Sequence, residues 1–513
     1  MSRDWASNLR PRRAIGNIRD DITGDWYRDP WAWPEYDFLI SGNLDWLTRR
    51  ARATGIRHAI KIDVPKENFG IRPAIVMEPL DRLLYQSLVD AVSYRLIGEL
   101  PSWTYGWRLS RRSPRPGIYA AQNREWDRYR QYLKGSGLQF GYGIKTDIVS
   151  CFASIQIDLL CEQLQEKAGI TDTTNRLVDM LSAFNQIPGR GGLPQRSKAS
   201  STLANMYLDQ LSQALTDYTK LAAPPLLREL VGGTLAVRWM DDFWAFGHDE
   251  ALLRSFQVDL QSLGRQSGLE INLGKTDVYA DEDLWSAVAK IEHSAIDAAI
   301  KLDPPDVEPL EHLIDQLIDA PEKFDRTSIR FATTRMRAQR LRRKLDELLD
   351  ASPRMPHGAD HLARVFRDFR IWQSREDWFL EYADSPWGNI DWSIAQIGTM
   401  FPTHVSPSRP VKEKFIEFLT AGPSLPMMAL TAQRLSSWEP ATVRELIREL
   451  VEHTEHPQER RIIGLAAAAV GEDPAFIYKA LGEYEENQLT LKMLEMRGFE
   501  PLSPAPDFGP DTE

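Results

Sequence analysis

The chain has 513 residues, of which 42% are hydrophobic and 26% are charged. This length is typical of two or three domains of about 150 residues each, and the composition is that of a globular protein, which excludes collagen-like and low-complexity architectures. Its two cysteines, Cys151 and Cys161, are too few for a disulfide framework or a thiolate zinc site and fit a reducing compartment. The sequence shows neither an apolar run long enough to cross a membrane nor a signal peptide, so we expect a cytoplasmic protein without membrane contact.

The formal net charge of −11 is unevenly distributed. Residues 1–280 carry 35 Lys and Arg against 32 Asp and Glu, whereas residues 281–513 carry 27 against 41. We therefore expect the acidic C-terminal part to contact protein rather than to form an extensive nucleic-acid interface. Residues 101–150 are locally basic, and their cations and aromatic rings suit either a phosphate backbone with unstacked bases or a loop whose rings pack on its own core. The residues concerned are Trp103, Tyr105, Trp107, Arg108, Arg111, Arg112 and Arg115.

The first hundred residues predict an irregular segment followed by a strand and a helix. Residues 1–50 are rich in Trp and Pro and predict an irregular or short-helical segment rather than a tail, because so many rings are rarely left in solvent. We expect a strand over 56–64, a loop over 65–73 and a helix over 81–100, where apolar residues recur every three or four positions.

The next part of the chain predicts strands that alternate with helices. The segment LQFGYGIKTDI predicts a strand that ends in Asp147, and GGTLAVRWMDDFWAFG predicts two strands around a turn at Asp241-Asp242. The remaining segments have helical periodicity, apart from an extended stretch that closes the region. Helices are expected over 154–169, 197–220 and 249–268, and the extended stretch over 271–280.

Beyond about residue 285 nearly every segment has a helical pattern. Short amphipathic helices separated by Pro or Gly are typical of a helical-repeat array, here HEAT-like only in a loose sense because no repeat of fixed length is recognisable. The sequence therefore predicts an N-terminal segment (1–50), a central domain (51–285), an all-α domain (286–500) and a disordered tail (501–513).

Three aspartates carry the clearest chemical signal. Asp147 ends a predicted strand, and the pair Asp241-Asp242 lies at a predicted hairpin turn. Carboxylates at the ends of neighbouring core strands concentrate negative charge, which is costly unless a cation neutralises it. Mg²⁺ is commonly held by one or two carboxylates together with substrate phosphates, and two such ions promote phosphoryl transfer. The three acids suit the chemistry of a nucleotide polymerase, whereas an Asp-Asp pair taken alone is more often an ordinary turn.

Two segments resemble motifs of the reverse transcriptases, the RNA-directed DNA polymerases. DVPKENFGIRP resembles the fingers motif of that family, which implies that Lys66 and Arg72 hold the incoming triphosphate. KTDIVSCFASI resembles the first palm motif, which implies that Asp147 and the backbone carbonyl of Ile148 are metal ligands. The same resemblance implies that Phe152, five residues after the aspartate, is the gate against the ribose 2′-hydroxyl.

Three further motifs follow in the family order, so that the resemblance covers residues 55–280. GLPQRSKASSTLANMYL resembles the second palm motif, in which Gln195 is implied to contact nucleotide and template. VRWMDDF resembles the YxDD box with Trp in place of Tyr, which implies catalytic and metal-binding roles for Asp241 and Asp242. GLEINLGKTDVY resembles the motif whose lysine, here Lys275, approaches the leaving pyrophosphate.

The sequence also departs from the family pattern. Arg196 occupies the position of the usual Gly in the LPQG motif, and no primer-grip sequence follows Tyr279. RNase H, maturase and endonuclease patterns and the NAxxH and VTG signatures of retron enzymes are absent from the sequence, which disfavours those elements. The chain resembles instead the bacterial abortive-infection and unknown-group antiphage defence reverse transcriptases, which join this core to a helical-repeat domain. Some members of that group copy a non-coding RNA, and others extend DNA without a template or prime from a protein hydroxyl.

The resemblance implies an α+β fold with a right-hand polymerase fingers-palm core and a C-terminal all-α helical-repeat domain in the thumb position. It implies a nucleotidyltransferase that adds dNMPs to a 3′-hydroxyl, or to a protein hydroxyl at initiation, with two Mg²⁺ ions or with Mn²⁺ in their place. The expected partners are dNTPs, an RNA template or non-coding RNA, the DNA product and a second copy bound through the helical domain. The competing hypothesis is a polymerase core without catalysis that serves as a nucleic-acid or protein-binding sensor or scaffold. Templated and untemplated synthesis are both compatible with the sequence.

Overall fold

The computed structural model describes residues 4–110, 118–222, 235–289 and 291–506. The chain divides into two compact units. No helix in these described ranges is both long and apolar enough to span a lipid bilayer. The first unit comprises Met1–Gly24, Leu44–Ile56 and Leu80–Ser294, and the second comprises Asp25–Asn43, Arg57–Pro79 and Ala295–Glu513.

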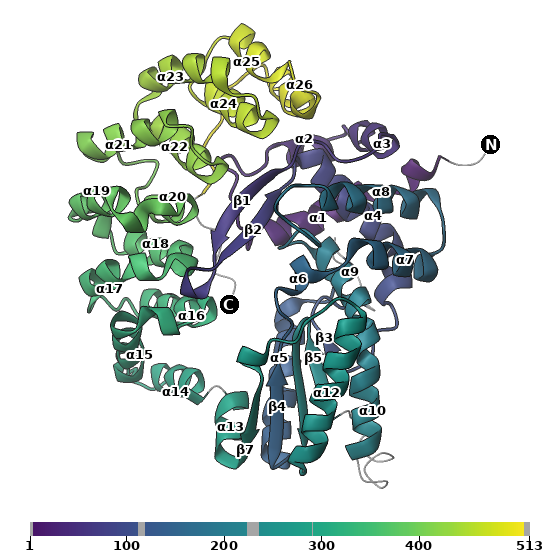
Figure 1. The fold of residues 1–513 in the computed structure, drawn as a ribbon. Coiled ribbons are helices and arrows are strands. Elements are labelled where there is room, and N and C mark those ends of the chain that lie inside the picture. Colours follow the sequence, from purple (N-terminus) through teal and green to yellow (C-terminus); the bar gives the residue numbers. More distant parts are fainter. Residues whose placement is uncertain (1–3, 111–117, 223–234, 290, 507–513) are drawn as a thin grey trace. The chain divides into compact units, whose positions relative to one another are not determined.

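The first unit is built on a five-stranded sheet (Figure 1). Its strands are β3 (Thr104–Tyr105), β4 (Tyr142–Thr146), β5 (Ala236–Trp239), β6 (Asp242–Gly247) and β7 (Asp277–Ala280), in the spatial order β3-β5-β6-β4-β7. β4 lies antiparallel between β6 and β7, whereas β5 pairs antiparallel with β6 and parallel with β3. The helices of this unit are η1 (Trp5–Asn8), α1 (Pro11–Ile22), α3 (Asp45–Arg52), α4 (Pro79–Ile97), α5 (Gln122–Gln139), α6 (Cys151–Ser154), α7 (Ile157–Ala168), α8 (Asp172–Asn185), α9 (Lys198–Tyr207), η3 (Leu208–Leu211), α10 (Ser212–Ala222), α12 (Glu250–Gln266), η4 (Leu273–Lys275), α13 (Asp281–Ala289) and the first part of α14 (Ile291–Ile300).

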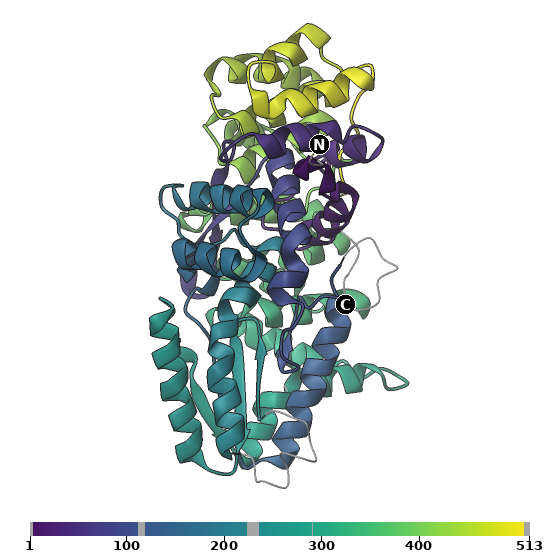
Figure 2. The same cartoon turned by 90° about the vertical axis from the view of Figure 1, so that its right-hand side faces the viewer.

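Helices cover both faces of this sheet because successive side chains of each strand point to opposite sides. The rings of Trp244 and Phe246 pack on one face with Tyr129 of α5 and Leu284 of α13. α10 and α12 contact β5 and β6 on the other face. Figure 2 shows the strands between the blue helix α5 and the teal helices. The strands that carry the predicted catalytic acids are therefore fixed from both sides.

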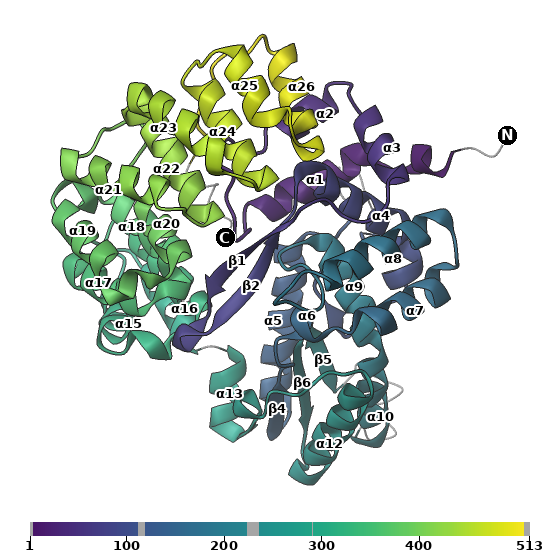
Figure 3. The same cartoon turned by 45° about the horizontal axis from the view of Figure 1, so that its top comes forward.

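The second unit contains a regular array of helices. Its helices are α2 (Glu35–Ile40), η2 (Glu67–Phe69), α15 (Glu308–Asp319), η5 (Pro321–Lys323), α16 (Arg326–Ala338), α17 (Leu345–Ala351), η6 (Ser352–Arg354), η7 (Pro356–Gly358), α18 (Ala359–Asp368), η8 (Ile371–Gln373), α19 (Glu376–Asp384), η9 (Pro386–Asn389), α20 (Asp391–Gly398), α21 (Arg409–Thr420), α22 (Leu425–Trp438), α23 (Pro440–His453), α24 (Pro457–Ala469), α25 (Pro474–Leu481), η10 (Glu485–Asn487) and α26 (Gln488–Met496). Alternate helices pack in a row, α16 on α18, α18 on α20, α20 on α22 and α22 on α24 (Figure 3). The all-α helical-repeat architecture predicted from the sequence is therefore correct.

The array has a nearly constant repeat length that the sequence analysis did not recognise. Each even-numbered helix from α16 to α26 begins 31 to 34 residues after the previous one. What recurs is the helix spacing and the burial of one apolar face, whereas the residues themselves differ from repeat to repeat. Connections of different length, some of them 3-10 helices, obscure the period in the sequence.

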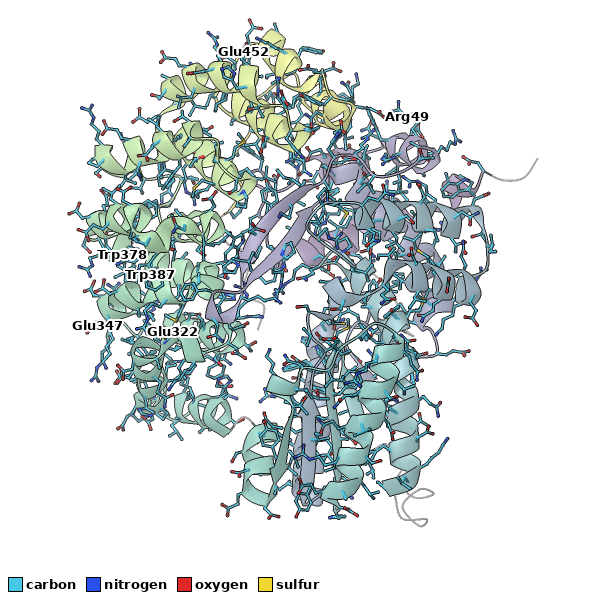
Figure 4. The ribbon with its side chains drawn as sticks, in the orientation of Figure 1. Arg49, Glu322, Glu347, Trp378, Trp387 and Glu452 are labelled. Carbon is cyan, nitrogen blue, oxygen red and sulfur yellow. The ribbon has the colours of Figure 1, made fainter. Side chains whose placement is uncertain are left out.

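Two N-terminal segments complete the second unit. The strands β1 (Ile60–Pro65) and β2 (Ile71–Val76) form an antiparallel hairpin that packs on α20. Trp26 meets Trp392 of α20 edge to face with ring centroids 6.2 Å apart, and Trp392 Nε1 donates a hydrogen bond to the Trp26 carbonyl. At the hairpin tip, Phe69 contacts Trp387, which is labelled in Figure 4, at a ring separation of 5.4 Å. The Trp-rich segment is thus ordered, as the sequence predicts, because its rings pack against helices.

Part of the predicted disordered tail is packed against other segments of the second unit. Leu502 is buried, and Ala505 N donates a hydrogen bond to the Pro30 carbonyl. Gln433 also donates to the Ala505 carbonyl. Residues 501–506 are therefore held by specific contacts, whereas residues 507–513 lie outside the described ranges.

The basic and aromatic stretch within 101–150 has structural partners wherever the structure describes it. The guanidinium of Arg108 donates to the carbonyls of Leu100, Pro101 and Thr104. The aromatic rings of this stretch pack on the core of the first unit or on Trp239. These contacts favour the interpretation of a loop packed on its own core. The arginines at 111, 112 and 115 lie outside the described residues.

Candidate active site

The end of β4 lies beside the hairpin formed by β5 and β6. β4 pairs with β6 in a register that sets Thr146 opposite Phe243. Because the pairing is antiparallel, the next position along this register sets Asp147 opposite Asp242. The sheet therefore brings together carboxylates that are far apart in the sequence.

A two-residue turn carries Asp241. Trp239 pairs with Asp242, so the turn consists of Met240 and Asp241 and lies one residue earlier than predicted. Met240 has a φ of 52°, the left-handed backbone that the tight turns of β-hairpins require. The two adjacent acids therefore occupy different positions: Asp241 lies in the turn, whereas Asp242 is the first residue of β6.

The surroundings of Asp241 disfavour its negative charge. Burial, then the charge of Asp242 and, with a smaller effect, that of Asp147 raise the pKa of Asp241 to about 7. Lys275 at the end of η4 has the opposite effect, and its Nζ lies 3.5 Å from Asp147 Oδ2. The three acids and the lysine predicted from the sequence thus form one electrostatically coupled group with an excess of negative charge.

The oxygens of this group fit a hard divalent cation. Among the described residues, no three or more His, Cys, Asp or Glu side chains are arranged as a closed metal site. Asp147 Oδ1, however, is buried and accepts no hydrogen bond from any residue that the structure describes. Mg²⁺ needs only one or two protein carboxylates when substrate phosphates complete its coordination shell. Asp147 and Asp241 are therefore suited to hold it, with Asp242 beside them.

The backbone at Ile148 also suits a metal ligand. Ile148 forms an isolated bridge with Ile271, and the hydrogen bonds of this bridge run from Val149 N to the Glu270 carbonyl and from Asn272 N to the Asp147 carbonyl. In this pattern the Ile148 carbonyl points away from the partner strand. The Ile148 carbonyl accepts neither hydrogen bond of the bridge, so its oxygen is available as a metal ligand.

The residues predicted to contact the nucleotide, Phe152 and Gln195, lie on segments that touch each other. Phe152 is half-buried in α6, and its carbonyl accepts a hydrogen bond of 2.8 Å from Leu193 N. A Cβ on Gly192, whose φ is +65°, would lie 1.9 Å from the same oxygen, so the close approach requires glycine. Gln195 is half-buried just beyond this contact. The structure thus joins the first and second palm motifs at the predicted sugar gate.

Arg196, the departure from the LPQG motif, has a left-handed backbone with a φ of 58°. Glycine adopts this conformation without steric cost, whereas other residues pay about 1 kcal/mol. The geometry explains why Gly is usual at this position, and the exposed side chain of Arg196 is compatible with the same turn.

A buried arginine that the sequence analysis did not single out lies next to the turn. Arg238 of β5 is fully buried, and its Nη1 donates to the Met240 carbonyl at 3.1 Å and to Asn205 Oδ1 of α9 at 3.0 Å. Burial lowers the pKa of Arg238 to about 10, although nearby acids, Asp241 among them, oppose this effect. The sequence signal that could have identified it is a lone cation in the apolar strand LAVRW.

The two cations of the predicted fingers motif, Lys66 and Arg72, belong to the second unit. Lys66 follows β1, and its backbone N donates to the Gly70 carbonyl across the hairpin turn. The guanidinium of Arg72 lies 4.9 Å from the centre of the Trp26 ring, which holds the side chain by a cation–π contact. The contact shows that Arg72 also has a structural role.

A mainly antiparallel core sheet with acids at one end and helices on both faces is the kind of site found in polymerase palms. Residues 64–313 match the family model described as reverse transcriptase (RNA-dependent DNA polymerase). This part of the chain is therefore a reverse transcriptase domain, and the five-stranded sheet is its palm.

The chain is only distantly similar to individual proteins of known structure. No curated protein matches the chain. A solved structure of apo telomerase from Candida tropicalis, truncated from its C-terminal domain, is 15% identical with a TM-score of 0.29 over 48% of this chain. The telomerase of Candida albicans in complex with the TWJ fragment of telomeric RNA is 11% identical with a TM-score of 0.29 over 65% of this chain. This chain spans 56% and 67% of those two proteins, respectively.

Proposed function

We propose that the protein is a DNA polymerase of the reverse transcriptase type that adds dNMPs to a 3′-hydroxyl. The observation that carries this proposal is the register of β4 and β6, which sets Asp147 beside the turn that holds Asp241. Two Mg²⁺ ions, or Mn²⁺ in their place, would be held by Asp147, Asp241 and the Ile148 carbonyl, with Asp242 in support. When bound, they supply charge stabilisation for the phosphoryl group and activate the attacking hydroxyl.

The remaining site residues act on the nucleotide in this proposal. Lys275, next to Asp147, stabilises the negative charge of the leaving pyrophosphate, as a fixed cation does in phosphoryl transfer. The ring of Phe152 excludes a ribose 2′-hydroxyl by contact. The cationic side chains of Lys66 and Arg72 bind the triphosphate. The amide of Gln195 contacts the nucleotide and the template.

The proposed partners are dNTPs, an RNA template or non-coding RNA and the DNA product. The helical array is proposed to contact a second copy of the chain. The resemblance to abortive-infection and unknown-group enzymes supports a role in bacterial antiphage defence, with initiation from a protein hydroxyl as a variant of the same reaction. These assignments rest on the sequence motifs.

The deciding experiment is a nucleotide incorporation assay with the purified full chain. The protein is incubated with Mg²⁺ or Mn²⁺ and labelled dNTPs, before and after removal of co-purifying nucleic acid, and the products are sequenced and treated with protease. DNA complementary to an RNA shows templated synthesis, whereas homopolymer or random DNA that survives removal of nucleic acid shows untemplated synthesis. Label that protease releases from the protein shows covalent priming. The absence of product with every nucleotide and both metals would contradict the proposal and favour the scaffold hypothesis.

Replacement of Phe152 should change sugar selectivity. Phe152→Val removes the ring while the backbone bond from Leu193 N to the Phe152 carbonyl stays intact. We expect the ratio of kcat/KM for dNTP over the matching rNTP to fall by about tenfold or more, since a contact worth 1.4 kcal/mol gives a factor of ten. Phe140→Val, at an aromatic residue packed on Phe246, is the control for loss of a ring. Unchanged selectivity in Phe152→Val would exclude the gate role.

Replacement of Arg238 should weaken catalysis through the turn. Arg238→Met removes the two hydrogen bonds to the Met240 carbonyl and to Asn205. We expect kcat to fall by about 10- to 100-fold with a smaller change in KM, because small displacements of catalytic groups are costly and Arg238 is fully buried, out of reach of a bound nucleotide. Arg238→Lys should restore part of kcat. Equal loss in both variants, in proportion to their unfolding midpoints, would show that Arg238 acts on stability alone.

A further inference from the structure

A strongly basic pocket lies in the helical array. Its volume is about 440 Å³, and it is formed where α16 and the neighbouring α18 end. The structure describes six lining residues, which include four arginines, one acid and one aromatic ring. They are Arg337, Arg340, Arg342, Asp368, Phe369 and Arg370.

The ends of α16 and α18 place an arginine in the pocket with the same local backbone geometry. α16 ends at Ala338 and α18 ends at Asp368, and each is followed two residues later by an arginine with a left-handed backbone. Arg340 has a φ of 52° and Arg370 a φ of 60°. Glycine is usual at this position after a helix because it adopts the conformation without cost. The pocket is therefore made by equivalent positions of two successive repeats, about 30 residues apart in sequence.

The charge of the pocket is not balanced by acids among the residues that the structure describes. Cations elsewhere in this part of the array pair with acids of a neighbouring repeat, such as Arg343 with Glu311 and Lys344 with Asp315. In the pocket, Arg337 pairs with Asp368 in the same way. The three other arginines have no carboxylate partner among the residues that the structure describes, and all three are exposed. These are Arg340, Arg342 and Arg370.

The chemistry of the pocket suits phosphate groups rather than bases. A guanidinium presents parallel N–H donors that match two oxygens of a phosphate. Phe369 is only 7% exposed, so its ring cannot stack on a base, and it packs instead against the guanidinium of Arg342 at 5.5 Å. Interaction with helix C-terminal carbonyls would explain one cation at each helix end. It would not explain three surplus cations around one cavity.

We propose that this arginine pocket binds the phosphodiester backbone of a nucleic-acid strand without reading its sequence. The inference rests on the proposed function, which supplies a template and a product strand as occupants. It also refines the expectation, drawn from the acidic balance of residues 281–513, that the helical domain makes little contact with nucleic acid. A local cluster of three arginines without a carboxylate partner among the described residues sets the potential at this site, because charges beyond about 8 Å are largely screened at physiological salt.

The test measures binding in the absence of dNTPs and metal, so that it does not depend on polymerase activity. The titrant is a labelled single strand of about 20 nucleotides, longer than the binding site of one module. The Arg340→Ala/Arg342→Ala/Arg370→Ala variant is compared with the Arg409→Ala/Lys492→Ala/Arg497→Ala variant, which removes the same charge from exposed positions outside the pocket. Because the pocket arginines are exposed, both variants should unfold at the wild-type midpoint, and Arg370→Glu provides a second, single-site test.

We expect the pocket variant to bind the strand about tenfold or more weakly than the control variant. The slope of log K against log salt concentration should also be smaller in magnitude by about 2, since each phosphate contact on a single strand contributes about 0.7 to that slope. Mixed-sequence and oligo(dT) strands should lose affinity equally. Equal binding by the two triple variants, with Arg370→Glu also unchanged, would overturn the proposal. Competition by inorganic pyrophosphate at concentrations similar to the strand would also overturn it, because the pocket would then hold a free phosphate. Because strand binding is measured without dNTPs and metal, and incorporation is measured in its own assay, failure of this proposal is distinguished from failure of the polymerase assignment.

Discussion

Asp147→Asn should reduce dNMP incorporation by at least about a thousandfold and leave the protein folded. The change removes one full negative charge from the group of acids that would hold the metal ions, and losses of several kcal/mol in transition-state stabilisation correspond to factors of this size. Asp147 Oδ1 accepts no hydrogen bond from the described residues, so the folded chain loses little when the carboxylate becomes an amide. We therefore expect an unfolding midpoint at or slightly above that of the wild type, because repulsion from Asp241 is relieved.

The same assay separates the roles of the three acids. Asp241→Asn should be as inactive as Asp147→Asn, whereas Asp242→Asn, at the first position of β6, should lose only about tenfold. Asp259→Asn on the exposed side of α12 is the control for loss of a surface carboxylate and should keep full activity. Full incorporation by both Asp147→Asn and Asp241→Asn would refute the active-site assignment, and inactivity with a lowered midpoint would indicate misfolding instead.

The palm could be predicted closely because its signals are local. Alternation of apolar residues predicts the strands, and the strand ends predict where Asp147 and Asp241 lie. The turn was misplaced by one residue because two consecutive aspartates fit a turn equally well, whereas the ladder between Trp239 and Asp242 decides between them. The role of Arg238 could not be predicted, because its partners, the Met240 carbonyl and Asn205, come together only in the folded protein.

The helical array was predicted as a class but not in its details. The net charge of residues 281–513 averages over the whole surface, whereas the arginine pocket arises where two helix ends from successive repeats meet. The burial of the Trp-rich segment was predicted from its composition, yet its partners could not be. Trp26 packs on Trp392, and the acids Asp29 and Glu35 meet an arginine more than 400 residues further along the chain.

That arginine, Arg461 of α24, should be costly to replace because it is buried together with both acids. Its guanidinium donates two hydrogen bonds to Glu35 and one to Asp29, and all three side chains are at most 4% exposed. Despite burial, which acts in the opposite direction, the two acids raise the pKa of Arg461 well above its usual value, and Arg461 in turn lowers the pKa of Glu35. Thr490 of α26 also donates to Glu35, so the network ties the N-terminal segment to the last two even-numbered helices.

Arg461→Met should lower the free energy of unfolding by about 3–5 kcal/mol, because it leaves Asp29 and Glu35 as buried acids without a counter-charge. Urea denaturation followed by tryptophan fluorescence measures the change, since Trp33 lies 4.7 Å from the guanidinium. Arg409→Met, at a residue whose side chain is 85% exposed, should shift stability by no more than about 0.5 kcal/mol. Adding Glu35→Gln and Asp29→Asn to Arg461→Met should recover part of the loss, because the penalty comes from the uncompensated charges rather than from the missing side chain. If the triple variant were less stable than Arg461→Met alone, the hydrogen bonds of the acids to Thr490 and to the backbone N–H groups of Trp31 and Trp33 would matter more than their charge.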